Sequence, residues 1–192
     1  MVSSRALFTL AVGAVAAQRL LETRVSARNE AALRAQGARE HASGQYVQMR
    51  LLHGSWLVAM LAEVWFFDRV FDARVAAVAA SVFVVGQLLR AAAMHALGPR
   101  WTVKIITVPG ESAVRRGVFA WIRHPNYLGV CLEIAALPLV HGAWITAVVY
   151  SVWNAWLLRS RIRAEEKALT LDAGYDAVMA GRPRFLPQWW SR

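Results

Sequence analysis

Four neighbouring residues, Arg123 to Asn126, place basic and polar side chains directly before an apolar segment that begins at Tyr127. Pro125 suits the first turn of a helix and biases His124 away from the helical region. A helix that begins there exposes free backbone N–H groups and the positive end of its dipole beside Arg123 and His124. This arrangement is suited to binding a carboxylate or a phosphate. The alternative is that these residues only mark the interfacial end of a membrane span, with His124 in contact with lipid headgroups.

A second charged group, which contains Arg161, Glu165 and Glu166, follows the last apolar segment of the chain. Arg161 and Glu165 are four residues apart, so on a helix they share one face. They could hold a polar ligand together, or they could form an ordinary surface ion pair worth about 0.3–0.5 kcal/mol. Basic residues are also expected directly after a membrane span. By itself this second group therefore favours a structural role.

Two further charged residues lie inside apolar segments, Arg90 in one and Glu133 in another. Ionisable side chains at such depth are costly, and they usually face a polar cavity or each other. Gln87 shares a helical face with Arg90, because the two are three residues apart. The pattern predicts either the wall of a pocket or a polar contact between helices.

The composition indicates the environment of these residues. Of the 192 residues 57% are hydrophobic, yet the formal net charge is +10, a combination that fits a membrane protein with basic ends better than a soluble domain. The single cysteine, Cys131, excludes an internal disulfide and a CxxC metal site. The absence of a GxGxxG motif argues against a Rossmann-type dinucleotide site. We expect no metal site and no nucleic-acid binding, because the arginines stand between apolar segments and not along one polar face.

Five apolar segments divide the chain, and each can cross a membrane alone or with one turn from its flanks. They are Ala6–Leu21, Leu51–Phe67, Val75–Leu97, Tyr127–Val140 and Ala143–Leu158. The last two are separated by His141 and Gly142 alone, so we expect a helical hairpin. The predicted fold is all-α, a polytopic membrane helical bundle of about five transmembrane helices with a C-terminal hairpin and a cytoplasmic, cofactor-binding tail. A cleaved signal peptide is the alternative for the first segment.

The distribution of basic residues predicts the topology. Lys and Arg are frequent over residues 19–50, over 100–123 and from 159 onward, and sparse on the other side of the segments. By the positive-inside rule the C-terminus is cytoplasmic, and the protein is a multi-pass protein of a bacterial plasma membrane. Residues 22–41 are expected to form an interfacial amphipathic helix that ends near Gly37, or an ordinary solvated helix.

We divide the chain into three parts on this basis. Residues 1–50 hold the first span and the basic amphipathic segment, and residues 51–98 hold the second and third spans. Residues 99–192 hold the cytoplasmic connector, the hairpin and the tail, and they contain most of the residues with chemical potential.

The order and spacing of these groups resemble the isoprenylcysteine carboxyl methyltransferase (ICMT) family, in its short bacterial branch. The match runs from Gln87 to Pro187 and depends most on two elements, Arg123-His124-Pro125-x-Tyr127-x-Gly129 and Glu165-Glu166, which the hairpin separates. It also includes Gln87-x-x-Arg90, Leu97-Gly98-x-x-Trp101-Thr102, Gly117-x-Phe119, Glu133, Pro138-Leu139, Arg161, Tyr175 and Arg184-Phe185-Leu186-Pro187. Phe119 departs from the pattern, because many relatives carry tyrosine there.

A shorter pattern near the N-terminus, Ser26-x-Arg28-Asn29-x-x-x-Leu33-x-x-x-Gly37-Ala38, resembles a bacterial subset found with type III polyketide synthases. Members of that subset O-methylate long-chain alkylpyrones or alkylresorcinols. The resemblance therefore implies a lipophilic acceptor and a functional association with a type III polyketide synthase.

The family resemblance implies S-adenosylmethionine as the methyl donor and assigns a role to each matching residue. The cofactor site is expected to be lined by Arg123, His124, Tyr127, Gly129 and Glu165. Arg161 is expected to orient the acceptor, and we group Arg90 and Glu133 with it in acceptor binding. Arg161, Glu165 and His124 are the expected catalytic residues. Methyl transfer is an in-line displacement at a sulfonium, so the enzyme mainly aligns the nucleophile with the methyl group and excludes water.

The acceptor and the activity have alternatives. A carboxylate acceptor needs only positioning, whereas a phenol or enol would benefit from a base such as His124 or Glu165. A phospholipid amine is a third class of acceptor. A membrane reductase of the sterol-reductase-like type could bind NADPH in the same cleft, and a non-enzymatic module could bind anionic membrane lipids with its basic loops.

Overall fold

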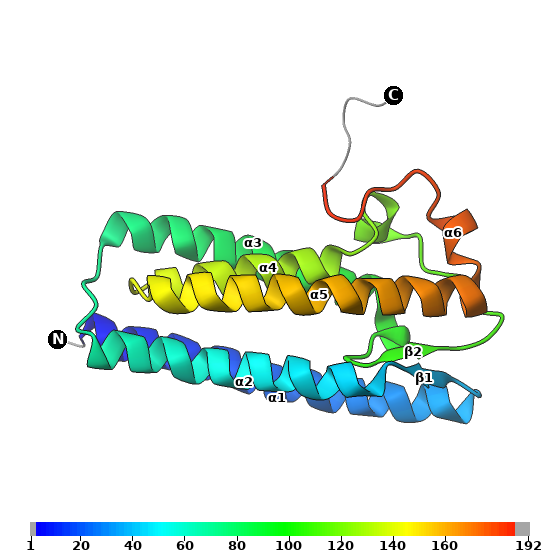
Figure 1. Ribbon diagram of the computed structural model, residues 1–192, viewed down its shortest axis with the longest axis horizontal. Helices are drawn as coiled ribbons and strands as arrows, with labels where there is room; N and C mark the ends of the chain where they lie inside the picture. Colours follow the sequence, from blue (N-terminus) through cyan, green and yellow to red (C-terminus); the bar gives the residue numbers. More distant parts are fainter. Residues whose placement is uncertain (1–2, 187–192) are drawn as a thin grey trace.

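The protein is a bundle of long helices that lie nearly along one axis (Figure 1). The computed structural model describes residues 3–186, so Pro187 at the end of the last motif lies outside the described residues. The elements are α1 (Ser4–Ala35), β1 (Arg39–His41), α2 (Ser43–Phe66), α3 (Ala73–Leu97), the 3-10 turn η1 (Gly98–Arg100), β2 (Ile105–Thr107), the 3-10 turn η2 (Gly117–Ala120), α4 (Pro125–Leu139), α5 (Trp144–Ala173) and α6 (Tyr175–Val178). In Figure 1, α1 and α2 form one layer, and α3, α4 and α5 form a second.

The first helix is longer than predicted. α1 runs without a break to Ala35, so the predicted membrane segment over residues 6–21 and the predicted amphipathic helix over residues 22–41 are one helix. A helix separate from the first segment is therefore not formed, and charged side chains such as Glu22 bind other helices of the bundle. The end of the helix is close to the predicted position, since Gly37 adopts the left-handed conformation that ends many helices, with φ +84°.

The second helix begins earlier than the apolar segment that predicted it. α2 starts at Ser43, directly after β1, so the division expected after residue 50 falls inside a helix. α3 begins at its predicted place because the Asp72 side chain caps it. Asp72 Oδ1 accepts hydrogen bonds from the backbone N–H groups of Arg74 (2.8 Å) and Val75 (3.0 Å).

The predicted hairpin is present, with residues 140–143 joining α4 to α5. Gly142 turns the chain in the left-handed conformation, with φ +69°. The N-terminus of α5 is satisfied by a carboxylate from α2. Glu63 accepts hydrogen bonds from the backbone N–H groups of Ile145 (3.1 Å) and Thr146 (2.7 Å), which favours this end of the helix electrostatically.

α3 and α4 approach each other closely because glycine stands at two facing positions, Gly86 and Gly129. A Cβ atom on Gly129 would lie 2.5 Å from Cγ of Arg90 and 2.7 Å from the carbonyl oxygen of Gly86. Both distances are far below van der Waals contact, so a side chain at this position would push the two helices apart. Gly129 therefore serves the packing of the helices that carry Arg90 and the start of α4.

The fold is mostly helical, but the prediction of a purely helical protein missed one feature. β1 and β2 form a two-stranded antiparallel ribbon in which Arg39 lies opposite Thr107 and His41 lies opposite Ile105. Thr107 also donates a hydrogen bond to Asp172 near the end of α5. Each strand has three residues and its partner is distant in the sequence, so no local periodicity could reveal the pairing.

The surface of the bundle carries many exposed large apolar side chains, as expected where a protein faces lipid. Examples from several helices are Leu10, Leu20, Val58, Val78, Leu88, Val152 and Trp156. By length and composition, α1 and the segment Ala73–Arg100 could cross a membrane, and α4 is a shorter apolar helix. The arrangement of five spans stays a prediction for α2, α4 and α5.

Candidate functional site

A cavity of about 490 Å³ lies between the two layers of the bundle, and its volume is typical of sites for small molecules. Its walls come from α1, α2, α3, the start of α4, the second half of α5, α6 and the connector that contains β2. The ribbon and α6 gather at the end of the bundle where α1 and α5 end (Figure 1). The cavity thus extends from this polar end toward the apolar middle of the bundle.

The predicted helix start at Pro125 is confirmed, and it places His124 in the cavity wall. His124 precedes the helix with φ −127° and ψ 57°, outside the helical region, as Pro125 requires. Its ring is buried, with 4% of the residue exposed, and it stacks on Tyr127 with 5.5 Å between the ring centroids. The start of α4 is therefore a rigid, preorganised part of the site.

The two charged groups of the sequence meet in the structure. Nε2 of His124 lies 3.0 Å from Oε1 of Glu166, and Nδ1 lies 3.8 Å from Oε2 of Glu165. A carboxylate only accepts hydrogen bonds, so Nε2 carries a hydrogen in this contact. The long α5 makes the meeting possible, because it carries Glu165 and Glu166 beyond the hairpin and back to the start of α4.

The tail after α6 is bound to the start of α4. The backbone N–H groups of Arg123 and His124 donate to the carbonyl oxygens of Pro183 (2.9 Å) and Arg184 (3.0 Å). Arg184 also donates two hydrogen bonds to the carboxylate of Glu166, at 3.0 and 2.6 Å. Burial acts to raise the pKa of Glu166, but the hydrogen bonds from Arg184 and His124 outweigh it and hold that pKa below its ordinary value.

Arg123 lines the cavity, but its polar contacts hold the tail. Its Nε donates to the carbonyl oxygen of Arg182 (2.7 Å), its guanidinium carbon lies 5.9 Å from the ring centroid of Tyr175, and its Nη1 lies 3.9 Å from Glu166. The geometry therefore makes Arg123 a positioning residue for the tail and α6.

Arg161 is buried, and its hydrogen bonds run to α4 and to the connector. Its Nε donates to the hydroxyl oxygen of Tyr127 at 2.9 Å, and its Nη2 donates to the carbonyl oxygen of Val103. The surface ion pair considered from the spacing is therefore not the role of Arg161. One guanidinium group instead joins α5 to α4 and to the connector while it lines the cavity.

Several buried polar atoms of the cavity wall lack a hydrogen-bond partner within residues 3–186. They are Oδ1 of Asn126, Oε2 of Glu165, the hydroxyl oxygen of Tyr175, and Nε of Arg19 and Arg90. An unsatisfied buried polar atom costs about 1–3 kcal/mol, so such a concentration indicates a site built for a polar ligand. Burial raises the pKa of Tyr175, with Glu165 and Glu166 adding to the effect, so its hydroxyl group stays protonated and can donate.

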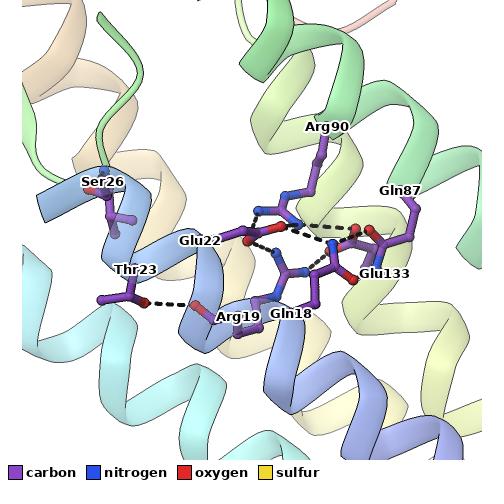
Figure 2. Close-up of polar contacts among 9 residues, drawn as sticks. Gln18, Arg19, Glu22, Thr23, Ser26, Gln87, Arg90 and Glu133 are labelled. Atoms are coloured by element: carbon purple, nitrogen blue, oxygen red, sulfur yellow. Dashed lines mark hydrogen bonds and ion pairs between the residues drawn. The ribbon is translucent and has the colours of Figure 1, made fainter. Parts of the chain in front are cut away.

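Figure 2 shows a charged network that joins α1, α3 and α4 beside the cavity. Arg90 binds Glu22 at 2.7 Å and Glu133 at 3.4 Å, while Arg19 binds Glu22 at 2.8 Å and also binds Glu133. Two positive and two negative groups thus neutralise each other, which is the condition for burying them together.

The sequence interpretation found Arg90 and Glu133 but missed their partners on α1. Arg19 and Glu22 stand at the end of the first apolar segment, where charged residues usually lie at the membrane–water interface. The sequence therefore did not indicate that these two side chains are largely buried. Arg19, Glu22 and Arg90 line the cavity, whereas Glu133 and Gly129 do not appear among the described residues of its wall. Asn126, one of the four polar residues named before the apolar segment but given no role, is a further wall residue.

Other proteins are similar to this chain in sequence or in fold. Residues 76–171 match the model of the "Isoprenylcysteine carboxyl methyltransferase (ICMT) family". An uncharacterized protein of Bacillus subtilis (strain 168), YpbQ, is 36% identical over 163 residues, which are 85% of this chain and 96% of that protein. An uncharacterized protein of Haemophilus influenzae is 28% identical over 158 residues, which are 81% of this chain and 91% of that protein.

Two eukaryotic proteins match a smaller part of this chain. The protein-S-isoprenylcysteine O-methyltransferase of Saccharomyces cerevisiae is 33% identical over 91 residues, 45% of this chain and 37% of the yeast protein. The solved structure of a eukaryotic intramembrane Ras methyltransferase, ICMT, has a similar fold, with a TM-score of 0.53, 22% identity, and coverage of 64% of this chain and 45% of that one. This chain therefore spans less than half the length of each of these two proteins.

Proposed function

This chain belongs to the ICMT family of membrane methyltransferases, and we propose that it transfers a methyl group from S-adenosylmethionine to an oxygen atom of a long-chain lipid. The observation that carries the proposal is the cavity with two environments. Buried polar atoms without a hydrogen-bond partner among the described residues lie at its end near α6. Apolar side chains of Ala16, Leu20, Leu57 and Val130 line its inner part, beside the mutually neutralised charges of Arg19, Glu22 and Arg90. A polar cofactor and a lipid acceptor need these two environments side by side.

We assign the cofactor to the polar end, between the start of α4 and α6. S-adenosylmethionine supplies a methyl group on a positively charged sulfur. Glu165 and Asn126 offer free acceptor oxygens within the described part of the chain, and the Tyr175 hydroxyl offers a donor. The first backbone N–H groups of α4 favour a carboxylate there. His124 and Tyr127 form the stacked wall beside these groups.

We assign the polar head of the acceptor to the region of Arg161, with Arg90 at the inner end of the same cavity. Arg161 is held by Tyr127 and Val103, so its guanidinium plane is fixed and can align an oxygen nucleophile with the methyl group. The acceptor is a carboxylate, or a phenol or enol such as that of an alkylpyrone or alkylresorcinol. Glu133, which is not among the described wall residues, holds Arg19 and Arg90 in position through ion pairs.

The proposed setting is a bacterial plasma membrane, with the C-terminus in the cytoplasm and a functional association with a type III polyketide synthase. The excess of basic residues at the end of the bundle that holds the ribbon and α6 supports this orientation. A membrane-impermeant thiol reagent applied to intact cells should label cysteine introduced by Asp72→Cys but not by Ala113→Cys. Labelling at position 113 would contradict the orientation.

The test of the proposed function is cofactor binding to the detergent-purified protein. S-adenosylmethionine should bind to the wild type, and His124→Ala and Glu165→Ala should each weaken binding at least about tenfold, or about 1.4 kcal/mol. The reason is that each substitution removes a polar side chain from the cavity wall at the end to which we assign the cofactor. Isothermal titration calorimetry measures both affinities directly.

Arg74→Ala is the matched control, because Arg74 lies at the opposite end of the bundle, next to the cap of α3. It should leave the affinity unchanged. Folded wild-type protein that binds NADPH and not S-adenosylmethionine would replace the proposal with the reductase alternative. Unchanged affinity in both site variants would move the cofactor away from His124 and Glu165.

A further inference from the structure

His53 of α2 has no role in the site as described so far, although it lines the same cavity. Its Nδ1 lies 2.8 Å from the carbonyl oxygen of Met49, one turn earlier on the same helix. A carbonyl oxygen only accepts, so Nδ1 must carry the hydrogen. In the neutral ring Nε2 then holds the free lone pair. The helix thus fixes both the orientation and the tautomer of this imidazole.

His53 is half-buried and is part of the cavity wall. Arg19 of α1 and Arg161 of α5 line the same cavity. Arg19 is neutralised by Glu22 and Glu133, but Arg161 lies outside that network, and its positive charge can stabilise an oxygen atom that loses its proton. A lipid carboxylate would not need a proton acceptor, since a carboxyl group has a pKa of about 4 and is already ionised at neutral pH.

Two other residues of the wall that could accept a proton, His124 and Glu165, are placed differently. Nε2 of His124 is engaged with Glu166, and its ring is packed between Tyr127 and Phe185. Glu165 lies 3.8 Å from that ring, on the side that we assign to the cofactor. His53 stands on α2, in the layer opposite α4 and α5 (Figure 1). An acceptor between the two layers would therefore have His53 on one side and the start of α4 on the other.

We propose that His53 is the proton acceptor of the reaction, and that the physiological acceptor is a lipid with a weakly acidic hydroxyl group, a phenol or an enol. This inference rests on the proposed methyltransferase function and narrows its acceptor class. The hydroxyl oxygen forms a bond to the methyl carbon as the carbon–sulfur bond breaks, and the electron pair of that bond stays on sulfur. The hydroxyl proton passes to Nε2 of His53, from which it later returns to water.

The first test measures binding without a methyl donor, with two probes that differ in one proton donor. Purified protein is titrated with meta-pentadecylphenol and with its methyl ether. The wild type should prefer the phenol by about threefold to tenfold, the contribution of one hydrogen bond. His53→Phe keeps the ring shape and removes the lone pair, so the preference should vanish. His95→Phe, at an exposed position of α3 that is not among the described cavity residues, should retain it.

The second test separates hydrogen bonding from proton transfer. His53→Gln supplies an oxygen that accepts a hydrogen bond but cannot take the proton. It should retain the binding preference for the phenol and lose methyl transfer to it by about a hundredfold or more, the usual contribution of a general base. Transfer to palmitic acid, which needs no base, should change by less than about threefold in the same variant.

The outcomes distinguish the two proposals. A preference for the phenol that survives in folded His53→Phe protein overturns the role of His53, and so does an equal loss of transfer to phenol and palmitic acid in His53→Gln. Wild-type protein that binds no S-adenosylmethionine overturns the methyltransferase function instead, and the probe titrations still decide whether His53 binds a hydroxyl group.

Discussion

Replacing Arg161 by lysine is expected to lower methyl transfer to a lipid acceptor by about ten- to a thousandfold, or about 1.4–4 kcal/mol of transition-state stabilisation. Arg161 bonds the hydroxyl group of Tyr127 and the carbonyl oxygen of Val103 with two edges of one planar group. Lysine keeps the charge but cannot hold both partners in that plane, so the acceptor loses its alignment. Turnover with an alkylpyrone or alkylresorcinol measures the effect.

Calorimetry on the same preparation gives the accompanying result. The affinity for S-adenosylmethionine should stay within about threefold, since only the alignment of the acceptor is disturbed. Arg163→Lys is the matched control, because Arg163 is exposed on the same helix and should be silent in both measurements. If Arg161→Lys loses cofactor affinity in proportion to turnover, Arg161 belongs to the cofactor site and the division of roles is wrong.

Replacing Glu133 by glutamine is expected to lower the free energy of unfolding by about 3 kcal/mol, the lower end for breaking a buried ion pair. Glutamine keeps the shape of the side chain, but it leaves Arg19 and Arg90 with Glu22 as the remaining negative partner in the network of Figure 2. The uncompensated positive charge is buried between α1, α3 and α4. The midpoint of thermal unfolding in detergent measures the loss.

A second variant tests the explanation by charge. Arg19→Gln in the Glu133→Gln background restores neutrality, so the double variant should lose less stability than the sum of the two single variants. Glu40→Gln is the control, because Glu40 pairs with the more exposed Arg34 and should cost at most about 1 kcal/mol. Strictly additive losses would show that the network is not held by its charge balance.

The amino-acid sequence by itself determined the features that depend on neighbours along the chain. The start of α4 at Pro125 follows from the restrictions that proline places on its own and the preceding residue. The hairpin follows from two apolar segments separated by a two-residue turn. The order of two short motifs, Arg123–Gly129 and Glu165-Glu166, was sufficient to identify the family. The residues within each motif are close together in the sequence, so the motifs can be recognised without the structure.

Only the tertiary structure shows which contacts each of those residues makes. The family resemblance implies a cofactor role for Gly129, and the structure adds that its missing side chain allows α3 and α4 to approach. Arg123 binds the tail through the carbonyl oxygen of Arg182. Arg19, Glu22 and His53 carried no local sign of a role, since their partners are other helices or the shared cavity. The physical reason is that backbone propensity and hydrophobic periodicity act over a few residues, whereas burial, charge pairing and the fixing of a tautomer depend on which distant segments pack together.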